Sequence, residues 1–234
     1  MLVAPRPLQR GIPHFNRKPP VGLSSQQLHS ALDTLAALEP AFATALSCVG
    51  YPQPRISEPG YTTLLRTIVG QQVSVAAAAS MWRKLGDAVG ADYQPARIAS
   101  ASDEELRTAG LSRQKASYAR SLAALVTSGE LDLHDLPVDN EEAIALLTRV
   151  KGIGRWSAEI YLLFAEGRPD IWPAGDLAVQ EEIGRILGHE TRPGEKLTRT
   201  LADPWRPHRG AAAIFAWHHY GNRLAAGKAA KAPL

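Results

Sequence analysis

Residues 147–158 read LTRVKGIGRWSA, and this short stretch decides the fold. One helical pattern ends before it and another begins after Gly154. Gly152 and Gly154 permit a positive φ and the close approach of another backbone. The second helix opens with free N–H groups that suit a phosphate oxygen, and the cations Lys151 and Arg155 flank the turn. The stretch therefore predicts a hairpin that binds a DNA backbone without reading bases; a plain helix–turn–helix corner with a glycine C-cap is the alternative.

Helical signals continue on both sides of this hairpin. Capping-box patterns begin at Ser102 and Asp139, and Ser74 and Ser112 are typical N-caps. Residues 50–60 are rich in glycine and proline and read as a linker. No period-2 pattern predicts a strand, so we predict an all-α fold. Helices are expected over residues 24–39, 41–49, 61–69, 74–89, 102–110, 112–127 and 139–149.

Composition bounds the class of protein. The chain has 234 residues, 45 % of them hydrophobic, which excludes a wholly disordered chain. Cys48 is the single cysteine, which excludes an internal disulfide framework and a four-cysteine zinc or iron–sulfur site. No apolar run reaches the roughly 18 residues of a membrane span. We expect a protein of a reducing, bacterial cytoplasm with no membrane partner.

The charge is uneven along the chain. Lysine plus arginine number 26 against 23 acidic residues, for a net charge of +3. Residues 1–20 contain four cations and no acid, and we predict a disordered basic arm there. Residues 205–234 hold five cations and no acid, which leaves 3 − 4 − 5 = −6 for the middle. Basic ends suit a polyanion, but charge alone favours simple solvated termini.

The hairpin and its surroundings resemble a known family. The spacing of residues 147–158 is similar to the helix–hairpin–helix motif of base-excision DNA glycosylases. That pattern continues with a Gly/Pro-rich turn and an aspartate about 20 residues on; here residues 171–179 read IWPAGDLAV. Over roughly residues 55–220 the chain resembles the DNA-3-methyladenine glycosylase II family, of the helix–hairpin–helix, Gly/Pro-Asp superfamily. Asp176 matches the family's catalytic aspartate. It also reads as a helix N-cap, and the two roles are compatible because a helix N-terminus favours a negative charge.

Two further segments carry the resemblance. Residues 70–76 read GQQVSVA, and in the family the residue after the first glutamine enters the duplex as a wedge; here that is Gln72, where some members have leucine. The segment from Trp205 to Trp217 is similar to the family's C-terminal signature, which puts Trp217 at the position that stacks on the base. Read alone, Gln72 is a polar interruption of a helix, and Trp217 is a core tryptophan.

The resemblance implies a chemistry. In the glycosylase/lyase branch a lysine occupies the position of Trp156 and attacks the sugar, so tryptophan there predicts a monofunctional glycosylase without lyase activity. The Asp176 carboxylate would stabilise positive charge on the sugar. Aromatic walls favour cationic alkylated purines such as 3-methyladenine and 7-methylguanine. The base-pocket candidates are Trp156, Trp217 and Tyr161, whereas Ile160 replaces an aromatic residue that the family often has.

The resemblance also implies contacts at the hairpin. A monovalent cation would be held by the backbone carbonyls of Thr148, Val150 and Ile153, beside the DNA phosphate. No metal or redox cofactor is expected to be required. The predicted contacts with the DNA backbone are Lys151, Gly152, Gly154, Arg155 and Ser157.

The family fold implies two helical lobes with a DNA-binding cleft between them. Residues 61–174 would form the central lobe with the hairpin, and residues 21–60 plus 175–234 a discontinuous second lobe. We expect a monomer that acts on double-stranded DNA containing alkylated bases. Two alternatives stay open: a non-catalytic helix–hairpin–helix DNA-binding module, or a glycosylase of the same fold for another damaged or mismatched base.

Overall fold

The computed structural model describes residues 23–229, so the predicted basic arm of residues 1–20 lies outside the described residues. Within that range every regular element is a helix, which confirms the all-α prediction. The elements are α1 (Ser25–Leu38), α2 (Pro40–Val49), α3 (Tyr61–Gly70), α4 (Val75–Val89), α5 (Pro95–Ser100), α6 (Asp103–Thr108), α7 (Arg113–Thr127), α8 (Asn140–Leu147), α9 (Arg155–Phe164), α10 (Leu177–Ile186), α11 (Glu195–Leu201), the 3-10 turn η1 (Asp203–Trp205) and α12 (Arg209–Ala229).

Local capping explains where these helices begin. Ser24 and Ser102 form complete capping boxes, and Ser74 and Ser112 each accept a hydrogen bond from the backbone three residues on. The sequence pattern missed α5 and α11. Each buries a single side chain from its helical residues, and so short a helix has too little apolar periodicity to be recognised.

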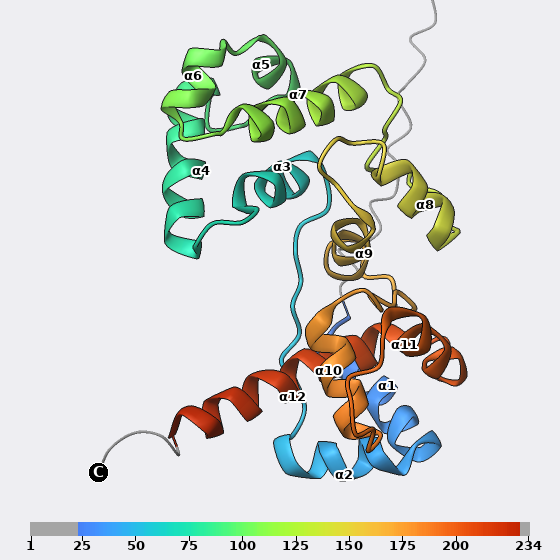
Figure 1. Cartoon of the computed structure of the whole chain (residues 1–234). Helices are drawn as coiled ribbons and strands as arrows, with labels where there is room; N and C mark the ends of the chain where they lie inside the picture. Colours follow the sequence, from blue (N-terminus) through green and yellow to red (C-terminus); the bar gives the residue numbers. More distant parts are fainter. Residues whose placement is uncertain (1–22, 230–234) are drawn as a thin grey trace, which may run out of the picture.

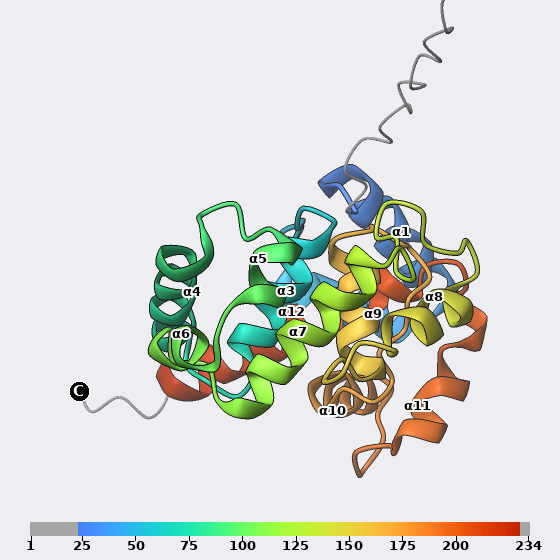
Figure 2. The same ribbon diagram turned by 90° about the horizontal axis from the view of Figure 1, so that it is seen from above.

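The helices fall into two groups (Figure 1). Helices α3–α7 lie together at one end, α1, α2 and α10–α12 lie at the other, and α9 stands between them. Seen from above, α12 passes behind α3 and α7 (Figure 2). The linker from α2 to α3 runs along α9, where the Ser57 N–H donates to the Phe164 carbonyl at 2.9 Å. This arrangement is compatible with the predicted lobes, whose boundaries stay a prediction.

Apolar packing holds α10 and α12 against the N-terminal helices. The α1 side chains Leu28, Leu32 and Leu35 are fully buried. Phe42 of α2 packs edge-on against Trp205, with ring centroids 5.0 Å apart. Burial of such side chains contributes about 1.5–3 kcal/mol each, so this group offers a rigid support for the residues at the start of α10. No helix in the described part of the chain is both long and apolar enough to cross a membrane.

Candidate active site and DNA interface

Asp176 is the N-cap of α10 and is held from both sides. Its Oδ1 accepts the backbone N–H groups of Ala178 and Val179, each at 2.9 Å. The turn that leads to it is fixed by Gln180, whose buried amide donates to the Ala174 carbonyl at 2.8 Å. The N-cap predicted from sequence is therefore confirmed, and it leaves the carboxylate half-buried.

Two tryptophans from other helices meet on this carboxylate. The Trp156 indole, at the start of α9, donates its Nε1–H to Oδ2 of Asp176 at 2.8 Å. The Trp217 indole, from α12, donates to Oδ1 at 3.2 Å. Oδ1 therefore has three donors and Oδ2 has one, so Oδ2 keeps a free lone pair. Trp156 remains 47 % exposed, so an aromatic residue bonded to the anion is accessible from solvent.

The third predicted pocket residue lies elsewhere. Tyr161 is 4 % exposed, and its hydroxyl accepts the Gly60 N–H at 2.7 Å. Burial raises the pKa of Tyr161 to about 12. Because the side chain is enclosed by the linker and α9, it has no open aromatic face, which corrects its assignment to the base pocket. Phe164 was missed by the sequence: its ring centroid lies 5.7 Å from that of Trp217.

The hairpin itself is shaped by a close approach. Gly152 has φ +82°, and a Cβ on it would lie 2.1 Å from the Tyr118 ring, so only glycine fits. Gly154 is the N-cap of α9, and within the described residues no side chain caps this helix. Its first N–H groups are therefore open to a phosphate oxygen, as predicted for a DNA-binding hairpin. Lys151 is exposed beside them, and Ser157 lies in the same first turn.

The carbonyls predicted to hold a cation belong to the same turn. The Val150 carbonyl accepts the Ile153 N–H at 3.0 Å and keeps a second lone pair. Thr148 is the C-cap of α8, where carbonyls lack helical partners. These positions fit a carbonyl-bound cation, which stays a prediction. Among the described residues no three His, Cys, Asp or Glu side chains gather as a metal site.

The wedge loop is tied to the hairpin by a residue that the sequence did not single out. The Gln71 side chain donates to the Gly152 carbonyl at 2.8 Å. The next residue, Gln72, is exposed and has φ +55°, which is uncommon for a side-chain-bearing residue. Lys115 of α7 donates to the Val69 carbonyl at 2.8 Å, just before the loop. The predicted wedge is thus presented at the tip of a loop anchored at two points.

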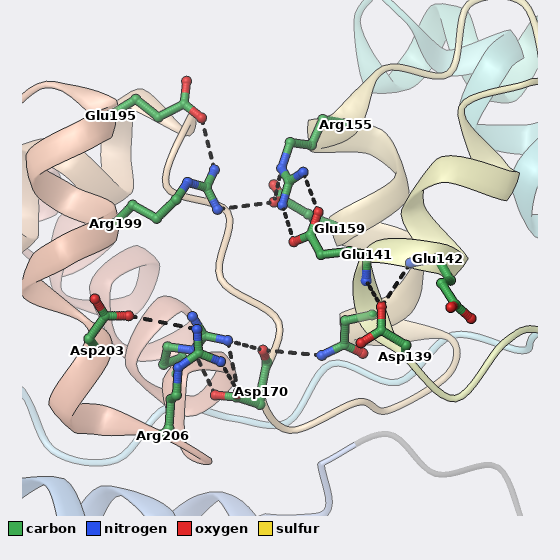
Figure 3. A network of polar contacts seen from close by, with 12 residues as sticks. Asp139, Glu141, Glu142, Arg155, Glu159, Asp170, Glu195, Arg199, Asp203 and Arg206 are labelled. Atoms are coloured by element: carbon green, nitrogen blue, oxygen red, sulfur yellow. Dashed lines mark hydrogen bonds and ion pairs between the residues drawn. The ribbon is translucent and has the colours of Figure 1, made fainter.

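Arg155, a predicted contact with the DNA backbone, is paired with acidic side chains in the structure. Its guanidinium forms a two-pronged ion pair with Glu141 of α8 and a 2.9 Å contact with Glu159 of α9 (Figure 3). The hydrogen bond raises the pKa of Arg155 and lowers that of Glu141. Arg155 is therefore already paired with Glu141, and its predicted contact with the DNA backbone stays a prediction. The group lines a cavity of about 820 Å³ that Asp176, Trp156 and Trp217 do not line.

Glu159 in this network predicts a pH dependence of stability. Burial raises its pKa to about 7, although Arg155 and Arg199 lie within 4 Å. A carboxyl whose pKa is higher in the folded than in the unfolded protein contributes its full stabilisation of the folded state at low pH. For Glu159 this stabilisation is lost as the pH rises through about 7. We expect Glu159→Gln to gain melting temperature relative to wild type between about pH 5 and about pH 8, by a few degrees.

Thermal unfolding across that pH range measures this difference. Glu104→Gln is the matched control, because Glu104 pairs with Arg107 on the exposed face of α6. Its difference from wild type should stay flat. A Glu159→Gln difference that is equally flat would contradict the buried-carboxyl interpretation.

The comparison with known proteins identifies the class. The family model of the HhH-GPD superfamily of base excision DNA repair proteins matches residues 65–207, and the chain belongs to this superfamily. Among proteins of known name, it is 29 % identical over 191 residues to DNA-3-methyladenine glycosylase 1 of Schizosaccharomyces pombe, covering 78 % of this chain and 83 % of that protein. A putative DNA-3-methyladenine glycosylase of Bacillus subtilis is 26 % identical over 165 residues, which are 67 % of this chain and 58 % of that protein. The chain thus spans less than two thirds of the length of the Bacillus subtilis relative.

Solved structures agree with this family. A DNA-3-methyladenine glycosidase from Bacillus halodurans superposes with a TM-score of 0.77 at 30 % identity, covering 83 % of this chain and 91 % of that one. The Schizosaccharomyces pombe 3-methyladenine DNA glycosylase in complex with abasic DNA gives a TM-score of 0.68 at 27 % identity, covering 80 % and 95 %. The family predicted from the hairpin is therefore confirmed.

Proposed function

We propose that this chain is a monofunctional DNA glycosylase that removes alkylated purines from double-stranded DNA. The observation that carries the proposal is the convergence of the Trp156 and Trp217 indoles on the Asp176 carboxylate, from three separate helices. A DNA-binding module needs the hairpin but has no use for such a site. The names of the relatives, DNA-3-methyladenine glycosylases, support the same substrate class.

The carboxylate supplies the electrostatic part of the reaction. When the bond from C1′ to the base nitrogen breaks, its electron pair leaves with the base and positive charge develops on the sugar. An ionised Asp176 beside the sugar stabilises that charge. A water oxygen then bonds to C1′, and its proton passes to Asp176 or to solvent. Oδ2 is the oxygen with a free lone pair, so we assign it to the sugar and the water.

The tryptophans account for selectivity. A base methylated at N3 or N7 carries a positive charge, which an indole face attracts by about 0.5–2 kcal/mol. The same charge makes the base a good leaving group, so no strong general acid is required. The target must first leave the stack at a cost of a few kcal/mol. Gln72 on its anchored loop and the open N-terminus of α9 would offset this cost by contacts with the duplex.

Base release is the direct test of the proposed function. Duplex DNA carrying labelled methyl groups is incubated with the protein, and the freed bases are separated by chromatography. We expect release of 3-methyladenine and 7-methylguanine. Binding of this DNA with no base released would favour the non-catalytic module, whereas release of an oxidised or mismatched base instead would keep the reaction and change the substrate.

A trapping experiment tests the absence of lyase activity. A lyase forms a Schiff base between an amine and the sugar, and borohydride reduces that bond to a permanent cross-link. Trp156 has no amine, and among the described residues the hydrogen-bond donors to Asp176 are two indoles and two backbone N–H groups. We expect no DNA-linked protein on a denaturing gel under conditions in which base release is complete. A borohydride-dependent cross-linked band would overturn the monofunctional assignment.

A further inference from the structure

A buried carboxylate joins the two helices that carry the site. Glu182 lies on α10 and is fully buried. Its Oε1 accepts the Arg223 Nε–H at 2.7 Å, and its Oε2 lies 2.6 Å from Nδ1 of His219. Both partners come from α12. Around them, Arg185 lies 4.0 Å from Glu182 and Glu181 lies 3.7 Å from Arg223.

The same two helices carry Asp176 and Trp217. Asp176 caps the start of α10, six residues before Glu182, and Trp217 stands two residues before His219 on α12. Figure 1 shows α10 packed on α12 in the lower group of helices. The Trp217 hydrogen bond to Asp176 measures 3.2 Å, close to the limit of about 3.5 Å for such a bond. A shift of α12 against α10 that lengthened this distance by about 0.3 Å would reach that limit.

Burial makes the contact of Glu182 specific to one register. A buried carboxylate without its partners is strongly unfavourable. Arg223 and His219 are spaced four residues apart, on one face of α12, and in the observed alignment each reaches one oxygen of Glu182. Apolar contacts between the helices tolerate small slides better than this pair does, because they are not directional.

We propose that Glu182 is a positioning residue for the glycosylase reaction. Through His219 and Arg223 it fixes the register of α10 and α12, and therefore the hydrogen bond from Trp217 to Asp176. The inference rests on the proposed function, because it concerns the rate of base release.

The test is the single-turnover rate of base release by Glu182→Gln from methylated duplex DNA. We expect a loss of about 10- to 100-fold, because small misplacements at a reacting centre have effects of this size, with DNA affinity within about twofold of wild type. Glu104→Gln is the matched control, because Glu104 pairs with Arg107 on the exposed face of α6 and belongs to neither α10 nor α12. Its rate should equal that of wild type.

A double-mutant cycle separates positioning from plain stability. Trp217→Phe keeps an aromatic face but removes the indole N–H. If Glu182 acts through the Trp217 hydrogen bond, Glu182→Gln should change the rate less than about twofold in the Trp217→Phe background. Its loss in melting temperature should be the same in both backgrounds. Equal rate losses in both backgrounds would overturn the proposal.

The outcomes remain distinct from those of the proposed function. If wild type releases no base, the glycosylase assignment fails. If wild type is active and Glu182→Gln matches it, only the positioning role fails. Should Glu182→Gln not fold, His219→Ala enters the same cycle, because it removes one partner and leaves the Arg223 contact in place. We expect His219→Ala to lower the rate of base release in the wild-type background but not in the Trp217→Phe background. An unchanged rate in the wild-type background would also reject the proposal.

Discussion

We expect Asp176→Asn to lower the single-turnover rate of base release by about 100- to 1000-fold, the usual effect of removing one electrostatic group that stabilises a transition state. The amide has nearly the same shape but carries no charge. The asparagine amide also cannot accept all four hydrogen bonds that the carboxylate accepts. If its oxygen accepts from the N–H groups of Ala178 and Val179, its NH₂ group faces the Trp156 N–H, so that two donors meet where the wild type has a bond of 2.8 Å. The site thus loses both the negative charge and the orientation of the indole.

Folding should survive this substitution. Asparagine is about as good an N-cap as aspartate, so α10 should still begin at Leu177. The measurement is therefore a rate at saturating protein, accompanied by a melting temperature and a DNA-binding isotherm. Affinity for methylated duplex should stay near that of wild type, because the hairpin is unchanged.

The chain offers a matched control for the loss of a capping carboxylate. Asp139 is the N-cap of α8, and its Oδ1 also accepts two backbone N–H groups at 2.9 Å, from Glu141 and Glu142. No tryptophan donates to it within the described residues. Asp139→Asn should lose a similar, small amount of stability and keep the full rate of base release. If Asp176→Asn stayed within tenfold of wild type, Asp176 would not be the catalytic carboxylate.

We expect Gly154→Asp to weaken DNA binding by about 10- to 100-fold, while the protein stays as stable as wild type or becomes more stable. Gly154 is an N-cap in extended conformation, with φ −87° and ψ 174°, and a Cβ there would meet no atom within 4 Å. Aspartate fits this position and caps α9 with its carboxylate, a favourable exchange for glycine. The same carboxylate occupies the N–H groups that we assign to a DNA phosphate and repels the phosphate itself.

The dependence of DNA affinity on base sequence and on salt concentration tests this prediction further. A contact with the backbone carries no base information, so the affinity should fall alike for methylated, unmodified and unrelated duplexes. The carboxylate also offsets about one of the positive charges that face the DNA, which should make the salt dependence of binding shallower, by about 0.9 in log–log slope. Gly154→Ala is the control, because it adds a Cβ without a charge and should bind within about threefold of wild type. Wild-type affinity in the Gly154→Asp variant would remove the N-terminus of α9 from the interface.

Much of the fold could be predicted because its signals are local. Helix starts can be predicted at Ser24, Ser102 and Asp139, because an N-cap side chain bonds backbone groups only two or three residues away. Gly152 is also a local signal, because glycine has no Cβ and readily adopts the positive φ that this turn has. Asp176 could be predicted as a cap from its neighbours alone. Its match to a catalytic aspartate rested on spacing from the hairpin, a pattern that resembles a family rather than one that physics dictates.

The environment of that carboxylate was decided by packing. Trp156 and Trp217 lie 20 and 41 residues from Asp176 and meet it only because α9, α10 and α12 converge. Tyr161 occupies the same helix as Trp156, yet the linker encloses it and its hydroxyl accepts the Gly60 N–H. An aromatic residue carries no local sign of which neighbour it will meet, so its type alone could not separate a pocket wall from the core.

Charges show the same division. From the sequence, Arg155 is a cation beside a phosphate-binding turn; in the structure it forms an ion pair with Glu141, 14 residues away. Glu182 reads as an ordinary helical glutamate until α12 covers it with His219 and Arg223. The sequence by itself determined where helices begin, where the chain turns and which residue types are available, because those depend on hydrogen bonds within one turn. Which side chains share a site was decided only in the tertiary structure, because contacts between distant residues depend on how whole helices pack.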